Sequence, residues 1–89
     1  MAVRYTKHAL DRMAQYGISR SMVEKAIQRG VCYFDPLNNS VVHVLQLASG
    51  AWFGVAQNPG TQVIKTILYD TKWSGVVNKR FRAGMYPCR

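Results

Sequence analysis

The fold of this chain is decided by residues 6–30, which read TKHALDRMAQYGISRSMVEKAIQRG. Apolar residues recur there at the spacing of an amphipathic helix: Ala9, Leu10, Met13 and Ala14, and then Met22, Val23, Ala26 and Ile27. The corner Gly17-Ile18-Ser19 separates the two apolar stripes, and Gly30 follows the second. Because glycine often follows the last turn of a helix, this stretch predicts a helical hairpin.

Both predicted helices carry start signals. Thr6 is the expected N-cap of the first helix, which stops at Gly17. Ser21 and Glu24 have the spacing of a capping box for the second helix, and Ser19 is the alternative N-cap. The second helix is therefore expected to begin at one of these two serines.

After Gly30 the apolar period becomes two, which is typical of strands. Turn signals separate four such runs: residues 31–35 (VCYFD), 41–47 (VVHVLQL), 51–57 (AWFGVAQ) and 62–70 (QVIKTILYD). Short connections favour an antiparallel meander, and the helices must bury their stripes on one of its faces. We therefore expect an α+β domain of order ααββββ, an N-terminal helical hairpin packed on a four-stranded antiparallel sheet.

The length and the charge of the chain limit the classes of function that it can have. The 89 residues make one domain, and a hydrophobic content of 48% excludes a disordered chain. Twelve Lys and Arg against four Asp and Glu give a net charge of +8, which indicates a polyanionic partner, although a basic protein with incidental charge is the alternative. The basic C-terminal segment 71–89 has no acid, so it is either a nucleic-acid-binding arm or a solvated tail. Its apolar residues favour a short helix, whereas Gly84 and Pro87 predict an irregular end.

Several classes of site and location are disfavoured. The first residues lack an apolar signal-peptide core, and no apolar run reaches the roughly 18 residues of a membrane span, so we expect a cytoplasmic protein with no membrane contact. Cys32 and Cys88 lie far apart in sequence, and free thiols are favoured over a bridge between them. They have no zinc-site spacing, and we expect no metal and no cofactor.

The residue types suit metal-independent cleavage of RNA. Only four acidic residues are present, in four separate elements, which leaves two-metal chemistry without its usual carboxylate ligands. Cleavage through the RNA 2′-hydroxyl needs instead a base, an acid and cations at the phosphate. His8 lies opposite the Leu10 and Met13 stripe, shares its face with Arg12 one turn later, and follows Lys7. An exposed helix face without function is the alternative.

The strands add further candidates. Lys65 and Tyr69 alternate on one face of the last strand and could reach one phosphate, whereas Thr66 lies on the other face. His43, among valines, is expected to be packed and satisfied. Four cations of the C-terminal segment complete the predicted RNA contacts, namely Lys72, Lys79, Arg80 and Arg82. The rings expected to stack on bases are those of Tyr69, Trp73 and Tyr86.

The chain resembles a family of short bacterial and phage proteins catalogued as domain of unknown function family 4258. The resemblance covers roughly residues 5 to 70 and is specific in its first part, which here reads His8-Ala9, Arg12-Met13, Gly17-Ile18-Ser19, Val23, Ala26-Ile27 and Gly30. It implies a RelE-like fold of the barnase/EndoU/colicin/RelE group, whose members cut RNA without metal and have an antitoxin or immunity protein. The catalytic residues it implies are His8, Arg12 and Thr66, with Tyr69. Tyr16 stands where the resemblance implies a basic residue.

The first hypothesis is thus a metal-independent RNA endonuclease toxin with an acidic antitoxin or immunity protein over the region from Lys72 to Arg82. The alternative is a non-catalytic module that binds nucleic acid or a protein, such as a phage-borne inhibitor of a host nucleic-acid enzyme. A third reading is a structural protein. The open edge of a four-stranded meander also favours a homodimer or a partner that adds a strand.

Overall fold

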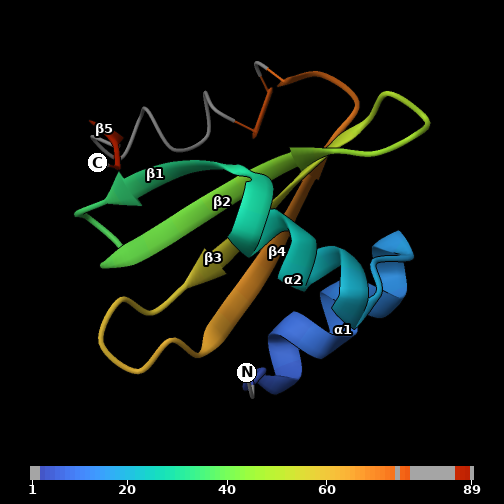
Figure 1. Cartoon of the computed structure of the whole chain (residues 1–89). Helices are drawn as coiled ribbons and strands as arrows, with labels where there is room; N and C mark the ends of the chain where they lie inside the picture. The colour runs from blue at the N-terminus through green and yellow to red at the C-terminus, as the bar shows by residue number, and fades with distance from the viewer. Residues whose placement is uncertain (1–2, 74, 77–85, 89) are drawn as a thin grey trace.

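A computed structural model describes residues 3–73, 75–76 and 86–88. Two helices precede an antiparallel sheet, which confirms the predicted α+β fold (Figure 1). The elements are α1 (Lys7–Tyr16), α2 (Arg20–Arg29), β1 (Val31–Asp35), β2 (Ser40–Gln46), β3 (Trp52–Gln57), β4 (Ile64–Asp70) and β5 (Tyr86–Pro87).

The helix ends follow the local signals, with one correction. The Thr6 hydroxyl accepts a hydrogen bond from the Ala9 amide at 3.0 Å, and Gly17 closes α1 in the left-handed region with φ of 68°. The N-cap of α2 is Ser19, because its hydroxyl accepts from the Met22 amide at 3.2 Å. The predicted capping box from Ser21 is wrong. Starting at Ser19 buries Ile18, the preceding residue, in the core.

The sheet has one strand more than predicted. Its strands follow the order β4-β3-β2-β1-β5, and every pair is antiparallel. In β5, Tyr86 and Pro87 pair with Phe34 and Tyr33 of β1. The expectation of an irregular end is therefore wrong at these two residues, because β1 offers an outer edge that the chain end can join.

A disulfide fixes this chain end, which corrects the expectation of free thiols. Cys32 of β1 is bonded to Cys88, 56 residues further along the sequence. The Cys88 amide also donates to the Cys32 carbonyl at 3.0 Å, and the two Cα atoms are 5.2 Å apart, within the normal range for a bridge. Sequence separation could not reveal this contact, because it depends on β5 pairing with β1.

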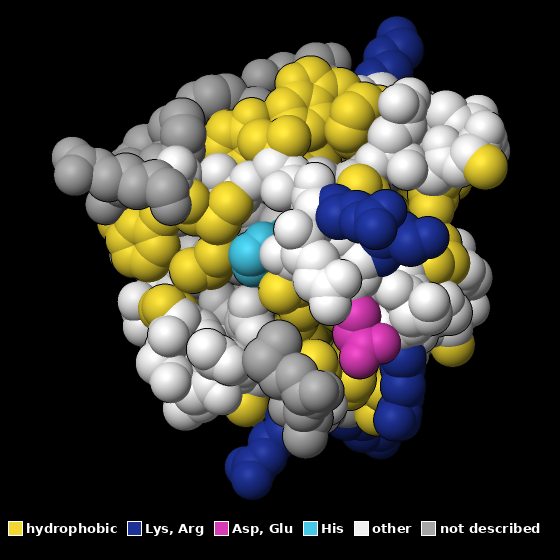
Figure 2. Space-filling view, in the orientation of Figure 1, with side chains coloured by type: hydrophobic (Ala, Val, Ile, Leu, Met, Phe, Trp, Pro, Cys, Tyr) yellow, Lys and Arg dark blue, Asp and Glu magenta, His cyan; other side chains and the backbone are white. Residues whose placement is uncertain are grey.

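The cations do not form one continuous patch on the face drawn in Figure 2. Lys and Arg side chains stand there at separate places, with apolar and uncharged surface between them.

In the described part of the chain, no helix is long and apolar enough to span a bilayer.

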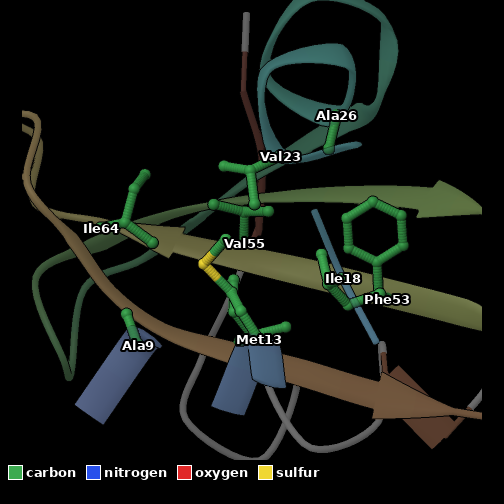
Figure 3. Packing of buried hydrophobic residues seen from close by; sticks show 9 residues of the cluster. Ala9, Met13, Ile18, Val23, Ala26, Phe53, Val55 and Ile64 are labelled. Carbon is green, nitrogen blue, oxygen red and sulfur yellow. The ribbon is translucent and has the colours of Figure 1, made fainter. Parts of the chain in front are cut away.

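The sheet is packed on both faces. On one face α1 and α2 bury part of their predicted stripes, and Met13 and Val23 point toward Val55 of β3 (Figure 3). Leu10 and Ala14 of the predicted α1 stripe are exposed, because α1 packs on the sheet by the side that carries Ala9 and Met13. The opposite face carries a second cluster of Val42, Val44, Ala56 and Val76. Trp73 closes this side, because its ring packs on Trp52 with centroids 4.6 Å apart. Residues of the basic C-terminal segment therefore belong to the core.

Candidate functional site

A flank of α1 and the adjoining strand β4 bring three predicted or neighbouring side chains together. The Arg12 guanidinium donates to the Tyr16 hydroxyl at 3.2 Å and to the Gln15 side chain at 3.1 Å. The Tyr16 ring stacks on Tyr69 of β4, with centroids 5.1 Å apart and planes within 13°. We call Arg12, Tyr16 and Tyr69 the arginine–tyrosine cluster. It presents a fixed cation beside two parallel rings.

His8 lies on the same flank, one helical turn before Arg12. Residues four apart on a helix have Cβ atoms about 5–6 Å apart, and from there the Arg12 guanidinium extends toward Gln15 and Tyr16. His8 and Lys7 are exposed, whereas Arg12 is half-buried. The flank therefore combines an accessible proton-exchanging group with an oriented cation.

Thr66 does not join this group. It pairs with Ala56 of β3, and cross-strand partners point to the same face of a sheet. Ala56 packs with Val42 and Val76 on the face away from the helices. The structure thus joins two of the four predicted catalytic residues, Arg12 and Tyr69, through Tyr16. His8 lies one turn before Arg12 on α1, and Thr66 lies on the opposite face of the sheet.

An irregularity at the start of β4 changes the predicted alternation of faces. Gln57 pairs with Ile64 while Ala56 pairs with Thr66, so one strand carries an extra residue at Lys65. Ile64 and Ile67 consequently both enter the core beneath the helices. The regular alternation on which the prediction for Lys65 and Tyr69 rests is therefore interrupted at Lys65, and a shared phosphate stays a prediction.

The Lys65 side chain donates hydrogen bonds to the turn between β1 and β2. Its ammonium donates to the Asn38 carbonyl at 2.6 Å and to the buried Ser40 hydroxyl at 2.8 Å. The carboxylate of Asp35 in turn accepts from the Asn38 side chain at 2.9 Å. These bonds direct the half-buried Lys65 side chain toward the turn between β1 and β2.

Two of the other predicted RNA contacts lie in the described part of the chain, Lys72 and Trp73. Lys72 is exposed. The Trp73 ring is occupied by Trp52 and by Tyr33, whose centroid is 6.0 Å away. Four further predictions lie outside the described residues or side chains, namely Lys79, Arg80, Arg82 and the ring of Tyr86.

His43 is packed, as predicted, but only half satisfied. It is 9% exposed, and its Nε2 lies 3.2 Å from the Gln57 side-chain oxygen. The pKa of His43 is lowered, because burial disfavours the charged ring more than this hydrogen bond favours it. Its Nδ1 is buried and has no hydrogen-bond partner. Nothing in the valine-rich sequence signalled this free nitrogen.

Tyr16 is the member of the site that sequence reasoning did not select. A signal was present, because Arg12 and Tyr16 have the spacing of side chains that meet on a helix. A tyrosine in place of the implied basic residue gives the cluster a ring and a hydroxyl that orients Arg12. Among the described residues, no group of three or more His, Cys, Asp or Glu side chains could hold a metal ion.

Comparison with known proteins gives a family and no function. No curated protein and no solved structure matches the chain significantly. A family model, described as Domain of unknown function (DUF4258), matches residues 5–69, from the segment before α1 into the end of β4. This match covers both helices and all residues of the arginine–tyrosine cluster, so the chain belongs to the DUF4258 family.

Proposed function

We propose that this protein is a metal-independent RNA endonuclease of the RelE-like toxin type. The observation that carries the proposal is the α1 flank. An exposed imidazole stands there one turn from a guanidinium that Tyr16 orients, beside a stacked pair of tyrosines. The net charge of +8 supports a polyanionic substrate. The proposal places the protein in the cytoplasm, where it would meet RNA.

The chemistry assigns one role to each group. The His8 imidazole takes the proton of an RNA 2′-hydroxyl, and the resulting oxygen attacks the adjacent phosphorus. The bond to the 5′-oxygen then breaks, that oxygen takes up a proton from water, and a 2′,3′-cyclic phosphate remains. Arg12 stabilises the charge that develops on the phosphate, and the ring of Tyr69 or Tyr16 supports a flanking base. Thr66 has no part in this site.

The proposal is tested by incubating purified protein with total RNA in EDTA and reading a denaturing gel. We expect discrete fragments from the wild type, none from His8→Ala, and at least about tenfold slower cleavage by Arg12→Ala. Lys25→Ala is the control for Arg12→Ala, because it also removes one cation from a helix, at an exposed position of α2 away from the cluster. Intact RNA with the wild type, or equal cleavage by His8→Ala, would reject the endonuclease.

The alternative is a module that binds RNA or a protein without cutting. It is favoured by the position of Thr66, which removes one of the four predicted catalytic residues from the site and leaves His8 as its one histidine. This module would shift RNA on a native gel, more weakly at high salt, and would tolerate His8→Ala. An acidic antitoxin or immunity protein fits either function, because the partner would neutralise the same cations.

A further inference from the structure

A second group of reactive side chains, which the proposed ribonuclease site does not use, lies on the paired strands β1 and β2. Cys32 and His43 are direct cross-strand partners there, so their side chains share a face with Cβ atoms about 4.5–5.5 Å apart. Cys32 carries the bond to Cys88. A buried imidazole therefore stands next to a disulfide.

The hydrogen bonds around His43 fix which nitrogen carries its proton. The amide group of Gln57 donates to the Gln62 carbonyl at 2.9 Å, so its oxygen faces His43. An amide oxygen only accepts, and Nε2 of His43 must therefore be the protonated nitrogen. Since burial keeps the ring neutral, Nδ1 is left as a buried acceptor without a donor.

Reduction of the disulfide would supply the missing donor. The sulfur of a disulfide carries no hydrogen, whereas a thiol carries one S–H. We propose that the Cys32–Cys88 disulfide is a reversible redox switch, in which His43 Nδ1 accepts the hydrogen bond of the reduced Cys32 thiol. The reductant is a cellular thiol or dithiol. This inference is independent of the proposed ribonuclease activity.

With a dithiol as the reductant, the electrons and protons of the thiol–disulfide exchange balance. Its thiolate attacks the Cys88 sulfur, the bond between Cys88 and Cys32 breaks, and Cys32 leaves, takes up a proton and donates it toward Nδ1. The second thiolate of the reductant then displaces Cys88, so that two electrons and two protons pass to the protein and the reductant becomes a disulfide. His43 favours Cys32 as the leaving group, because it stabilises the released thiol.

The switch controls how the chain end is held. β5 contains two residues, one of which is a proline without an amide hydrogen, so its pairing with β1 supplies few hydrogen bonds. Ordering backbone residues costs conformational entropy, which so short a pairing cannot offset without the covalent bond. Reduction therefore releases residues 86–88 and uncovers the outer edge of β1.

The test is a redox titration of the full chain in glutathione buffers, with alkylation of free thiols and mass spectrometry. We expect no free thiol in oxidised glutathione and two in reduced glutathione. His43→Gln, which loses the acceptor at Nδ1, should need a value of [GSH]²/[GSSG] about fivefold higher than the wild type. His43→Asn is the matched variant, because its amide oxygen takes the place of Nδ1 and should restore the wild-type midpoint.

Two measurements on the wild type keep the test independent of how the variants fold. The ¹⁵N resonance of His43 Nδ1 should move on reduction, and amide exchange should accelerate in Val31–Asp35 but not in the central strand β3. Cys88→Ser should exchange like the reduced wild type. The proposal is overturned by thiols that stay free in oxidised glutathione, by a disulfide that resists reduced glutathione in the folded protein, or by an Nδ1 resonance that is unchanged on reduction.

Discussion

The two outer edges of the sheet are each partly covered by a terminal segment of the described chain, by different means. At β4 the Ile64 amide donates to the Arg4 carbonyl at 2.8 Å, and the Thr6 amide donates to the Ile64 carbonyl at 3.0 Å. This segment continues directly into α1, which packs on β4. At β1 the closing residues 86–88 depend on a disulfide. One edge is thus held by local packing and the other by a bond that a reductant can break.

We expected an open edge of the sheet at which a second copy of the chain or an added strand could pair, but both edges are partly occupied. Residues 4–6 occupy the start of β4, and β5 occupies part of β1. An added strand at β1 would therefore compete with the chain's own end, and reduction would remove that competitor.

The largest effect is expected from opening the β1 edge. Cys88→Ser should lower the free energy of unfolding by about 4 kcal/mol under oxidising conditions, because the lost bridge spans 56 residues and no longer limits the unfolded chain. Urea unfolding of wild type and variant measures the difference. With excess dithiothreitol the two proteins should unfold alike, and a difference that persists there would show that Cys88 matters for another reason.

The β4 edge is broken by a core substitution. Ile64→Ala should cost about 3 kcal/mol, because this side chain is fully buried between the helices and the sheet and the cavity cannot close completely. The loss should be the same with and without dithiothreitol, in contrast to Cys88→Ser. Leu37→Ala, at a position 74% exposed, is the control and should stay within about 0.5 kcal/mol of the wild type.

The same contrast explains what could be predicted from the sequence. The α1–α2 hairpin was predictable because its signals are local: Thr6 caps three residues away, and Gly17 ends the helix it follows. The bridge to Cys88 was not, since only the paired strands bring the two cysteines together. At Lys65 one extra residue reverses the alternation of faces, and no residue there marks it.

The contacts of the candidate site are likewise of two kinds, those that follow from local spacing and those that depend on how the elements pack. Arg12 and Tyr16 are four residues apart on one helix, so their contact follows from helical spacing. The stack of Tyr16 on Tyr69 depends on how α1 lies along β4, and spacing cannot supply that. The face of Thr66 was predicted correctly relative to Leu68, but which face receives the helices is a property of the packed domain.

The N-cap residues of the two helices should differ in how much they contribute to the free energy of unfolding, and this difference is smaller than the effects above. The Thr6 hydroxyl accepts from the Ala9 amide and also donates to the Lys65 carbonyl at 2.9 Å, whereas the bond of the Ser19 hydroxyl is the cap of α2, from the Met22 amide. Ser19→Ala should cost about 1 kcal/mol and Thr6→Ala about 2 kcal/mol, by the loss of one and two hydrogen bonds. Thermal unfolding compares them, and equal losses would mean that the bond to β4 contributes nothing.

The smallest predicted effect is a pH dependence beside the β1 edge. Burial lowers the pKa of His43 in the folded protein below its ordinary 6.5, which the ring regains on unfolding. As the pH falls through 6.5, the unfolded chain binds a proton that the folded chain does not, so the free energy of unfolding decreases. This contribution is fully present above pH 6.5, and the loss between pH 7 and 6 is under about 1 kcal/mol. Urea unfolding of the oxidised protein at both pH values should therefore show a smaller decrease for His43→Gln than for the wild type. Equal decreases would mean that His43 binds its proton as readily in the folded protein as in the unfolded chain, and the neutral ring that leaves Nδ1 free to accept a thiol would lose its physical basis.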